Sequence, residues 1–385
     1  MKKVLLVFGT RPEAIKMAPL VNEFKKHPKC IDARVCVTAQ HREMLDQVLN
    51  VFNIQPDYDL NLMRSGQNLS DLTSSILLGM GRVLDDFNPD IVLVHGDTTT
   101  AFSVSISAFY HVNNNGKKVK IGHIEAGLRT DNIYNPWPEE MNRRVISVIA
   151  NYHFTPTTNS AKNLIKENKD EGSILITGNT VVDSLFLTLD NIKSDKNLKN
   201  KIKIKLNDQN FTIQKNRKFI LVTGHRRENF GIKIVNICKA LEEIALKNPG
   251  IDIIYPVHPN PKVQEPVNKI LSNKPNIFLI KPLCYESFVY LMHKSYFIIT
   301  DSGGVQEEAP SLGKPVLVTR DTTERPEAVE SGTVKLVGTN TSKIALEAQR
   351  LLNDNCEYLK MSRTNNPYGD GNSCKKIVDF VKART

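Results

Sequence analysis

Short apolar runs alternate with longer amphipathic stretches along the whole chain. Runs of about four to eight mostly apolar residues are typical of buried strands, and apolar residues that recur every three or four positions are typical of helices. The pattern predicts strands at 4–8, 34–38, 91–95, 120–124, 153–156, 174–177, 219–223, 251–256, 277–280, 297–300 and 316–319. Among the helices it predicts are those at 14–26, 69–86, 234–247 and 265–271.

The alternation of strands and helices falls into two series, which meet at residues 173–183. Such alternation indicates an α/β protein with two doubly wound parallel sheets and right-handed crossovers. Ligands of these sheets bind at the carboxyl ends of the strands, and two such domains facing each other form a cleft. We therefore expect the chemistry to lie in the segments that directly follow strands.

Length and composition narrow the class of protein. A chain of 385 residues, 40% apolar and 24% charged, is long enough for two or three domains and excludes a wholly disordered or collagen-like protein. The longest apolar runs fall short of the roughly 18 residues of a membrane span, and the run at 4–8 is too short for a secretion signal. The six cysteines form no C-x-x-C pair or zinc spacing, so we expect reduced thiols, no metal and a cytoplasmic protein.

The net charge of +10 raises the possibility of a polyanionic partner. Nine basic and two acidic residues lie within 191–218, so this one stretch holds seven of the ten excess charges. The remainder of the chain is nearly neutral. We therefore interpret the stretch as a Lys/Asn-rich connector and expect no nucleic acid or membrane as the main partner. A binder of nucleic acid or of an anionic surface that uses this stretch stays open as an alternative.

The first predicted strand ends in Gly9-Thr10-Arg11-Pro12-Glu13, and Lys16 follows one helical turn later. One glycine stands here where the dinucleotide fingerprint G-x-G-x-x-G has three, so we expect no nicotinamide cofactor. Arg11 and Lys16 at a helix N-terminus are suited to an anion. A plain strand-to-helix turn is the alternative.

Three carboxylates follow later strands of the first half. Asp97 lies in His95-Gly96-Asp97-Thr98, and Glu125 directly follows the strand at 120–124. Glu139 opens a helix after the stiff segment 135–138, which holds two prolines and the only tryptophan of the chain. Because the ends of neighbouring parallel strands meet at one edge, these carboxylates predict an acid/base group. The alternatives are an N-cap for Asp97 and an i,i+4 surface salt bridge between Glu139 and Arg143.

Two segments of the second half are suited to a phosphate. The strand at 219–223 runs into Gly224-His225-Arg226-Arg227, and the strand at 297–300 runs into Asp301-Ser302-Gly303-Gly304. Backbone N–H groups at a glycine-rich helix start bind phosphate, and histidine and arginine supply positive charge. Glu308, about one turn further on, can accept hydrogen bonds from ribose hydroxyls.

Long blocks of the chain, in order and from end to end, resemble the non-hydrolysing UDP-N-acetylglucosamine 2-epimerases of bacteria. The blocks are FGTRPEAIKMAPL (8–20), TAQHREMLDQVL (38–49), VLVHGDTTT (92–100), GHIEAGLRT (122–130), NPWPEEMNRR (135–144), ITGNTVVD (176–183), VTGHRREN (222–229), TDSGGVQEEAPSLGKPVLV (300–318), RDTTERPEAV (320–329) and NPYGDG (366–371).

The resemblance implies a fold of two Rossmann-like domains facing a cleft, as in GT-B glycosyltransferases. We accordingly expect an N-terminal domain of residues 1–172, completed by a C-terminal helix within 368–385, and a UDP-binding domain of residues 173–367. The last helix, near 373–383, is expected to pack on the first domain.

The resemblance also implies a reaction: reversible inversion of C2 between UDP-GlcNAc and UDP-ManNAc, which supplies ManNAc-type sugars for surface polysaccharides. The C2 proton is not next to a carbonyl, so direct deprotonation would be slow. The family breaks the C1–O bond instead, releases UDP while C2–H is removed, and adds UDP back to a 2-acetamidoglucal. This route needs acid/base groups near C2 and a cationic environment for the diphosphate.

By motif match, Asp97, Glu125 and Glu139 are the implied acid/base residues, and His225 steadies or protonates the leaving phosphate. The residues implied to bind the diphosphate and the sugar side are Arg11, Lys16, Arg143, Ser302, Gly303 and Gly304. Glu308 would bind the ribose hydroxyls, and Arg325 the nucleotide side. Phe288 and the backbone of Leu283 would cover the uracil.

The resemblance further implies a homodimer that needs no cofactor. Two alternatives stay open. One is a hydrolysing UDP-GlcNAc 2-epimerase, which releases UDP and free sugar, and the other is a GT-B glycosyltransferase, which consumes the donor only when an acceptor is present.

Overall fold

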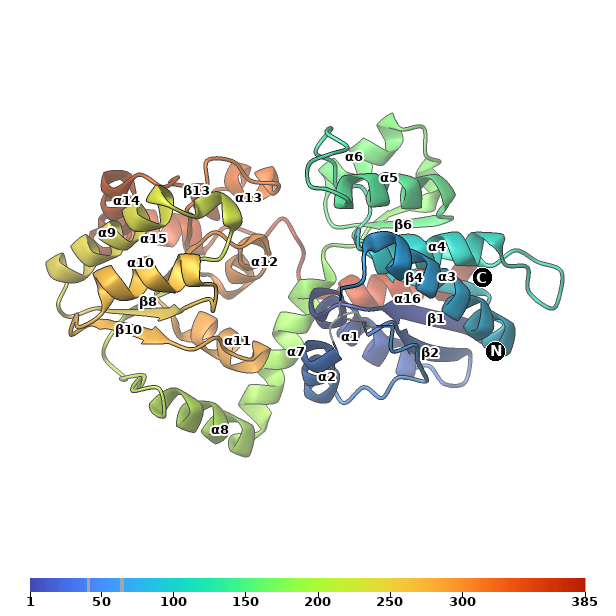
Figure 1. Cartoon of the computed structure of the whole chain (residues 1–385), viewed down its shortest axis with the longest axis horizontal. Helices are drawn as coiled ribbons and strands as arrows, with labels where there is room; N and C mark the ends of the chain where they lie inside the picture. Colours follow the sequence, from blue (N-terminus) through green and yellow to red (C-terminus); the bar gives the residue numbers. More distant parts are fainter. Residues whose placement is uncertain (40–41, 63–65, 385) are drawn as a thin grey trace. The chain divides into compact units, whose positions relative to one another are not determined.

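The computed structural model describes residues 1–39, 42–62 and 66–384. Within the predicted motif at 38–49, Gln40 and His41 lie outside the described residues. The chain divides into two compact units, one formed by Met1–Ser184 with Tyr368–Thr385 and the other by Leu185–Pro367 (Figure 1). Each unit is built around one parallel sheet.

The first unit contains a seven-stranded sheet in the order β3-β2-β1-β4-β5-β6-β7, in which neighbouring strands are parallel. Its strands are β1 (Lys2–Phe8), β2 (Ile31–Val37), β3 (Tyr58–Asp59), β4 (Ile91–His95), β5 (Lys120–Ile124), β6 (Tyr152–Thr155) and β7 (Ile174–Ile176). Its helices are α1 (Arg11–Lys25), α2 (Arg42–Val51), α3 (Leu69–Phe87), α4 (Thr99–Tyr110), α5 (Glu139–Ile149), α6 (Thr158–Lys166), α7 (Thr180–Ser194), which continues into the second unit, and α16 (Ser373–Arg384). A short 3-10 turn, η1 (Glu171–Ser173), precedes β7.

Helices cover both faces of this sheet. Helices α3, α4 and α5 contact one another in sequence on one side, and α1 contacts α2 and α16 on the other. The central strands β1 and β4 are buried apolar runs, and α3 and α4 pack on them in one core. Burial of apolar side chains on both faces explains why these strands are continuous apolar runs rather than alternating ones.

The second unit contains a six-stranded parallel sheet in the order β10-β9-β8-β11-β12-β13. Its strands are β8 (Phe219–Thr223), β9 (Asp252–Pro256), β10 (Ile277–Ile280), β11 (Phe297–Thr300), β12 (Val316–Val318) and β13 (Val334–Leu336). Its helices are α8 (Lys196–Asn207), α9 (Ile232–Lys247), α10 (Pro261–Leu271), α11 (Tyr285–Lys294), α12 (Gly303–Glu308), α13 (Pro326–Glu330), α14 (Thr341–Asn353) and α15 (Asn355–Ser362), with 3-10 turns η2 (Arg227–Asn229) and η3 (Ala309–Leu312). Helix α9 contacts α10 and α14, whereas α11 contacts α8 and η3. The core of the unit includes residues of β8, β9, β11, α9, α10 and α14.

The expectation of two doubly wound parallel sheets is confirmed. Two short edge strands, β3 and β13, were not predicted. The first unit also extends further than expected, because β7 pairs with β6 and residues up to Ser184 belong to it. We had placed the domain boundary after residue 172.

The C-terminal helix α16 is grouped with the first unit. Its first turn is fixed by the buried carboxylate of Asp183, which accepts hydrogen bonds from the backbone N–H groups of Ser373 (3.3 Å) and Cys374 (2.9 Å). At its other end, Phe380 packs edge-on against Tyr152 and Phe154 of β6. A carboxylate at a helix N-terminus stabilises the helix, since it satisfies unpaired N–H groups.

Each sheet has one point at which the strand order reverses. In the first unit it lies between β1 and β4, and in the second between β8 and β11. Crevices at the carboxyl ends of strands beside such a point are the usual ligand sites of open α/β sheets. The predicted site residues in the segments after β1, β4, β8 and β11 therefore lie where the topology favours a ligand. Within the described residues, no helix is long and apolar enough to cross a membrane.

Three buried histidines of the first sheet predict a loss of stability at acidic pH. Burial lowers the pKa of His95 to about 4, of His123 to about 3 and of His153 to about 4. The unfolded chain binds these protons below about pH 6.5, whereas the folded chain does not. The contribution of these neutral histidines to the free energy of unfolding is therefore complete above about pH 6.5, and it decreases as the pH falls toward 4.

We expect His153→Leu to reduce this pH dependence. Between pH 7 and pH 5, one histidine with such a shift lowers the free energy of unfolding by about 2 kcal/mol. Urea unfolding of the wild type and of the variant at both pH values measures the difference. An equal loss of stability in the two proteins on acidification would contradict the assignment.

Candidate active site

A cavity of about 560 Å³ opens at the carboxyl edge of the first sheet. Four of the predicted site residues line it: Arg11 and Lys16 from α1, Asp97 after β4, and Glu125 after β5. Its volume lies in the range of small-molecule sites. The first unit thus brings cationic and anionic candidates together in one place.

The segment after β1 is shaped by Thr10 and Glu13. The Thr10 hydroxyl caps α1, and the buried Glu13 carboxylate accepts hydrogen bonds from the backbone N–H groups of Gly9 (3.1 Å) and Thr10 (2.8 Å). The other oxygen of Glu13 accepts a hydrogen bond from the Thr98 hydroxyl at 2.6 Å. This capping box fixes the N-terminus of α1 against the segment that carries Asp97. Gly9 cannot carry a side chain, since a Cβ there would lie 2.0 Å from the Thr38 hydroxyl.

We expect Glu13→Ala to lower the free energy of unfolding by about 1–3 kcal/mol, because it leaves two backbone N–H groups and a threonine hydroxyl without their acceptor. Glu13→Gln should cost less, since its amide oxygen still accepts from the backbone and the Thr98 hydroxyl can turn to accept from the amide nitrogen. Urea unfolding of both variants measures the difference. Equal stability of the two variants would show that the acceptor is unimportant.

Asp97 is an ion-pair partner of Arg143 and not a helix cap. Thr98 caps α4 with its own hydroxyl, whereas the Asp97 carboxylate accepts a hydrogen bond from the Arg143 guanidinium. Asn142, beside Arg143 on α5, donates to the Asp97 backbone carbonyl at 2.8 Å. Burial raises the pKa of Asp97, and Arg143 opposes this effect. Glu125 and Glu139 raise the Asp97 pKa further, so both carboxylates lie close enough to act on Asp97.

Glu125 is held by polar side chains from separate elements. Its Oε2 accepts hydrogen bonds from the Lys16 ammonium and from the Asn179 amide at 2.7 Å, and the Nε2 of His95 lies 3.7 Å away. The backbone at Glu125 has φ +62°, the left-handed region that costs a residue with a side chain about 1–3 kcal/mol. Strain of this kind in a cavity wall is typical of functional sites.

Glu139 begins α5, one helical turn before Arg143. Arg143 pairs with Asp97 and Glu140 and makes no ion pair with Glu139, so the surface salt bridge considered as an alternative is not formed. The Oε2 of Glu139 is buried without a hydrogen-bond partner among the described residues. An unpaired buried carboxylate oxygen is costly, and this carboxylate lies close enough to Asp97 to act on it electrostatically.

In the second unit, the segment after β8 is organised by the buried carboxylate of Asp301. It accepts hydrogen bonds from the backbone N–H groups of His225 and Arg226, each at 2.9 Å, and from the Asn229 amide at 3.2 Å. The His225 ring stays 45% exposed and stacks on His258. Burial lowers the pKa of His225, Asp301 opposes this effect, and Arg226 and His258 lower it further. A neutral His225 ring can accept a proton near neutral pH, and the imidazolium that then forms can donate it.

Ser302, Gly303 and Gly304 begin the short helix α12 directly after Asp301. A Cβ at Gly303 would lie 2.8 Å from the Arg325 guanidinium, so the glycine permits the arginine to pack on this turn. Arg325 in turn donates to Glu307 (2.8 Å) and Glu324 (2.9 Å). The predicted phosphate turn and Arg325 thus lie together in the second unit.

Glu308, at the end of α12, accepts a hydrogen bond from the Tyr285 hydroxyl at 2.7 Å. Tyr285 is the first residue of α11, where Leu283 and Phe288 are half-buried. This bond fixes the start of α11, with the predicted uracil-covering residues, relative to the residue predicted to bind the ribose. Burial and the nearby Glu308 raise the Tyr285 pKa, which keeps the hydroxyl a donor.

Several supporting residues were missed by the sequence analysis. Glu13, Asn179, Asp301 and Tyr285 were not among the candidates, although each holds a candidate or its loop in place. Asp301 directly follows a predicted strand, and this signal could have found it. Across the described ranges, no group of three or more His, Cys, Asp or Glu residues is arranged to hold a metal ion.

Comparisons with known proteins agree with one another. The family model described as UDP-N-acetylglucosamine 2-epimerase matches residues 22–382. The UDP-N-acetylglucosamine 2-epimerase of Campylobacter jejuni is 60% identical over 99% of this chain and 97% of its own, and that of Escherichia coli K12 is 55% identical over 99% and 98%. The crystal structure of a UDP-GlcNAc 2-epimerase from Neisseria meningitidis, bound to UDP-GlcNAc, is similar with a TM-score of 0.89 and 51% identity, covering 99% of this chain and all of that one.

Proposed function

The chain belongs to the UDP-N-acetylglucosamine 2-epimerase family and is an isomerase of UDP-GlcNAc, and we propose that it inverts C2 by releasing UDP and adding it back. The observation that carries this mechanism is the grouping of Asp97, Glu125 and Glu139 at one edge of the first sheet. The chemistry needs acid/base groups near C2, and two or more carboxylates in unlike environments can supply them.

The proposed first step breaks two bonds of the sugar. One carboxylate takes the proton from C2, the C1–O bond breaks, and its electron pair leaves with UDP. A C1–C2 double bond forms, which gives the 2-acetamidoglucal. In the reverse step UDP adds to C1 and a second acid returns a proton to the other face of C2, so no electrons are gained or lost.

The two units supply different parts of this reaction. Lys16 and Arg143, which pair with Glu125 and Asp97, fix the carboxylates and add positive charge to the first unit. In the second unit, His225 and the turn at 302–304 are proposed to bind the diphosphate. Glu308 is proposed for the ribose, Arg325 for the nucleotide side, and Phe288 with the Leu283 backbone for the uracil.

The test incubates the protein with UDP-GlcNAc alone, without an added cofactor or sugar acceptor. We expect intact UDP-ManNAc, with one final mixture reached from either UDP-sugar. Accumulation of UDP and free ManNAc would indicate a hydrolysing epimerase instead. Consumption of UDP-GlcNAc only after an acceptor is added would indicate a glycosyltransferase.

Three finer expectations belong to the same proposal. The enzyme is proposed to be a cytoplasmic homodimer, and its UDP-ManNAc is proposed to supply surface polysaccharide synthesis. Light scattering on the purified protein tests the homodimer, and the mass of two chains is the expected result. A sustained mass of one chain at micromolar protein would contradict it.

A further inference from the structure

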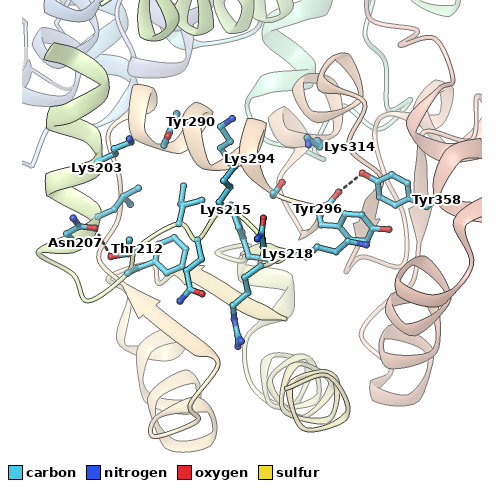
Figure 2. Close-up of a pocket in the computed structure, with 18 residues that line it drawn as sticks. Lys203, Asn207, Thr212, Lys215, Lys218, Tyr290, Lys294, Tyr296, Lys314 and Tyr358 are labelled. Carbon is cyan, nitrogen blue, oxygen red and sulfur yellow. Dashed lines mark hydrogen bonds between the residues drawn. The ribbon is translucent and has the colours of Figure 1, made fainter. Parts of the chain in front are cut away.

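A second cavity, of about 690 Å³, lies in the second unit and contains none of the candidate site residues. It is lined by α8, the segment between α8 and β8, the end of α11 and parts of the chain near β12 and in α15. Figure 2 shows Lys203, Lys215, Lys218, Lys294 and Lys314 around this hollow, with Tyr290, Tyr296 and Tyr358 in its walls. The volume lies in the range of about 300–1,000 Å³ that is usual for small-molecule sites.

The cavity lies at the opposite edge of the sheet from the proposed nucleotide groups. Phe219 in its wall is the first residue of β8, and Tyr296 and Lys314 precede β11 and β12. His225 and Ser302, by contrast, follow the carboxyl ends of β8 and β11. A strand of five residues spans roughly 16 Å, so the two places lie that far apart at opposite ends of the strands.

The lining is strongly basic. It contains no aspartate or glutamate, and its cationic residues are Lys203, Arg217, Lys215, Lys218, Lys294 and Lys314. Arg217 is neutralised by Asp252, whose carboxylate accepts its hydrogen bond at 2.7 Å. Within the part of the chain that the structure describes, none of the five lysines forms an ion pair with a carboxylate.

Two of these lysines, Lys294 and Lys314, repel each other. Burial lowers the pKa of Lys314, and the neighbouring Lys294 lowers it further. A bound anion would relieve this repulsion and compensate the half-buried ammonium group. The cavity therefore favours a negatively charged occupant.

The aromatic wall indicates which part of an anion the cavity can recognise. The Tyr296 ring stacks on Tyr358 at 4.3 Å, and the Lys218 ammonium lies 3.8 Å from the centre of the same ring. The Tyr358 ring and the Lys218 ammonium are both too close to the Tyr296 ring to lie on the same face of it. Both faces of Tyr296 are therefore occupied. Lysine ammonium groups bind phosphate as point charges, and no ring face of Tyr296 is left for a base.

We propose that this cavity is a binding site for a small phosphorylated anion, with Lys294 and Lys314 as its main phosphate-binding residues. A hollow formed by separate chain segments suits a compact ligand better than a membrane surface or a nucleic-acid duplex. The site is distinct from that of the UDP-sugar and does not depend on the proposed mechanism.

Titration calorimetry with sodium tripolyphosphate tests the proposal, with the protein saturated with UDP so that its nucleotide site is filled. At 150 mM salt we expect one saturable site per chain. The double variant Lys294→Gln/Lys314→Gln should bind at least tenfold more weakly, with unchanged kcat/KM for epimerisation. The matched control Lys201→Gln/Lys205→Gln removes the same charge from α8 residues that face Glu286 and do not line the cavity, and it should change the affinity less than twofold.

Absence of saturable tripolyphosphate binding to the UDP-loaded protein would overturn the proposal. An equal loss of tripolyphosphate affinity in both double variants would overturn it as well. Binding of anionic phospholipid vesicles or duplex DNA that requires Lys294 and Lys314, without binding of tripolyphosphate, would also overturn it and indicate a macromolecular surface. If the double variant does not fold, the single variant of the exposed Lys294, Lys294→Gln, is used. A threefold or larger weakening is then the expected result, and unchanged affinity contradicts the proposal.

Discussion

Glu125→Gln is expected to lower kcat by about 10²–10⁴-fold, the usual contribution of a positioned acid or base. The amide has nearly the same shape but can neither take nor return the C2 proton. It also loses the ion pair with Lys16 while keeping an acceptor for the Asn179 amide. The affinity for UDP should stay within several-fold of the wild type, since His225, the turn at 302–304, Glu308 and Arg325, which are proposed to bind UDP, belong to the second unit and do not depend on Glu125.

A matched control for this variant is Glu23→Gln. Glu23 also pairs with a lysine of its own unit, Lys26, but lies at the end of α1 remote from the cavity lining. It should retain the wild-type kcat. Initial rates of UDP-ManNAc formation, together with thermal unfolding of each variant, make the comparison. A kcat for Glu125→Gln within threefold of the wild type would exclude Glu125 as an acid/base residue.

Asp97→Asn is expected to lower kcat by a factor of the same order, for a different electrostatic reason. Burial and the nearby Glu125 and Glu139 raise the pKa of Asp97, whereas Arg143 keeps the ionised form accessible. A carboxyl group with opposing influences of this kind can both accept and donate a proton during turnover. The asparagine keeps a hydrogen-bond acceptor for Arg143 but has no proton to exchange.

The control for Asp97→Asn is Asp46→Asn, which removes a surface carboxylate that pairs with Arg42 on α2. We expect full activity in Asp46→Asn and UDP affinity within several-fold of the wild type in both variants. Turnover near the wild-type rate in Asp97→Asn would refute its role. Turnover that recovers when the pH is raised by two units would show that Asp97 only adjusts the protonation of another group.

The pattern of apolar runs predicted the sheets well because their strands are buried on both faces. The strands at 91–95, 120–124, 219–223, 277–280 and 297–300 have the predicted bounds. The edge strand at Tyr58–Asp59 has only two residues and no apolar run, so no local signal marked it. The domain boundary was placed too early because β7 joins the first sheet through pairing with β6, which is a tertiary event.

The candidate site was predicted less completely than the fold. Asp97, Glu125 and Glu139 are candidates because they follow strands or open a helix, and the two that act on Asp97 electrostatically are the other two of the group. Their fixing partners, such as Asn179 for Glu125, come from distant parts of the chain and carry no local pattern. The pairing of Arg143 with Asp97 instead of Glu139 likewise depends on how α5 packs on α4.

The structure differs most from the interpretation of the sequence at the basic stretch 191–218. In the sequence it was interpreted as a connector, yet its residues form α8 and one wall of a cavity. The other wall comes from Lys294 and Lys314, about 80 to 100 residues further along. A count of charges along the chain cannot show that these separate segments line one cavity, because their proximity is set by the tertiary fold.

The central claim is that the C2–H bond breaks and that solvent supplies the returning proton. The most direct test is the conversion of UDP-GlcNAc in D₂O, followed by mass spectrometry and proton NMR of the product. We expect every molecule of UDP-ManNAc to carry one deuterium at C2. UDP-ManNAc formed at the normal rate without deuterium at C2 would contradict it.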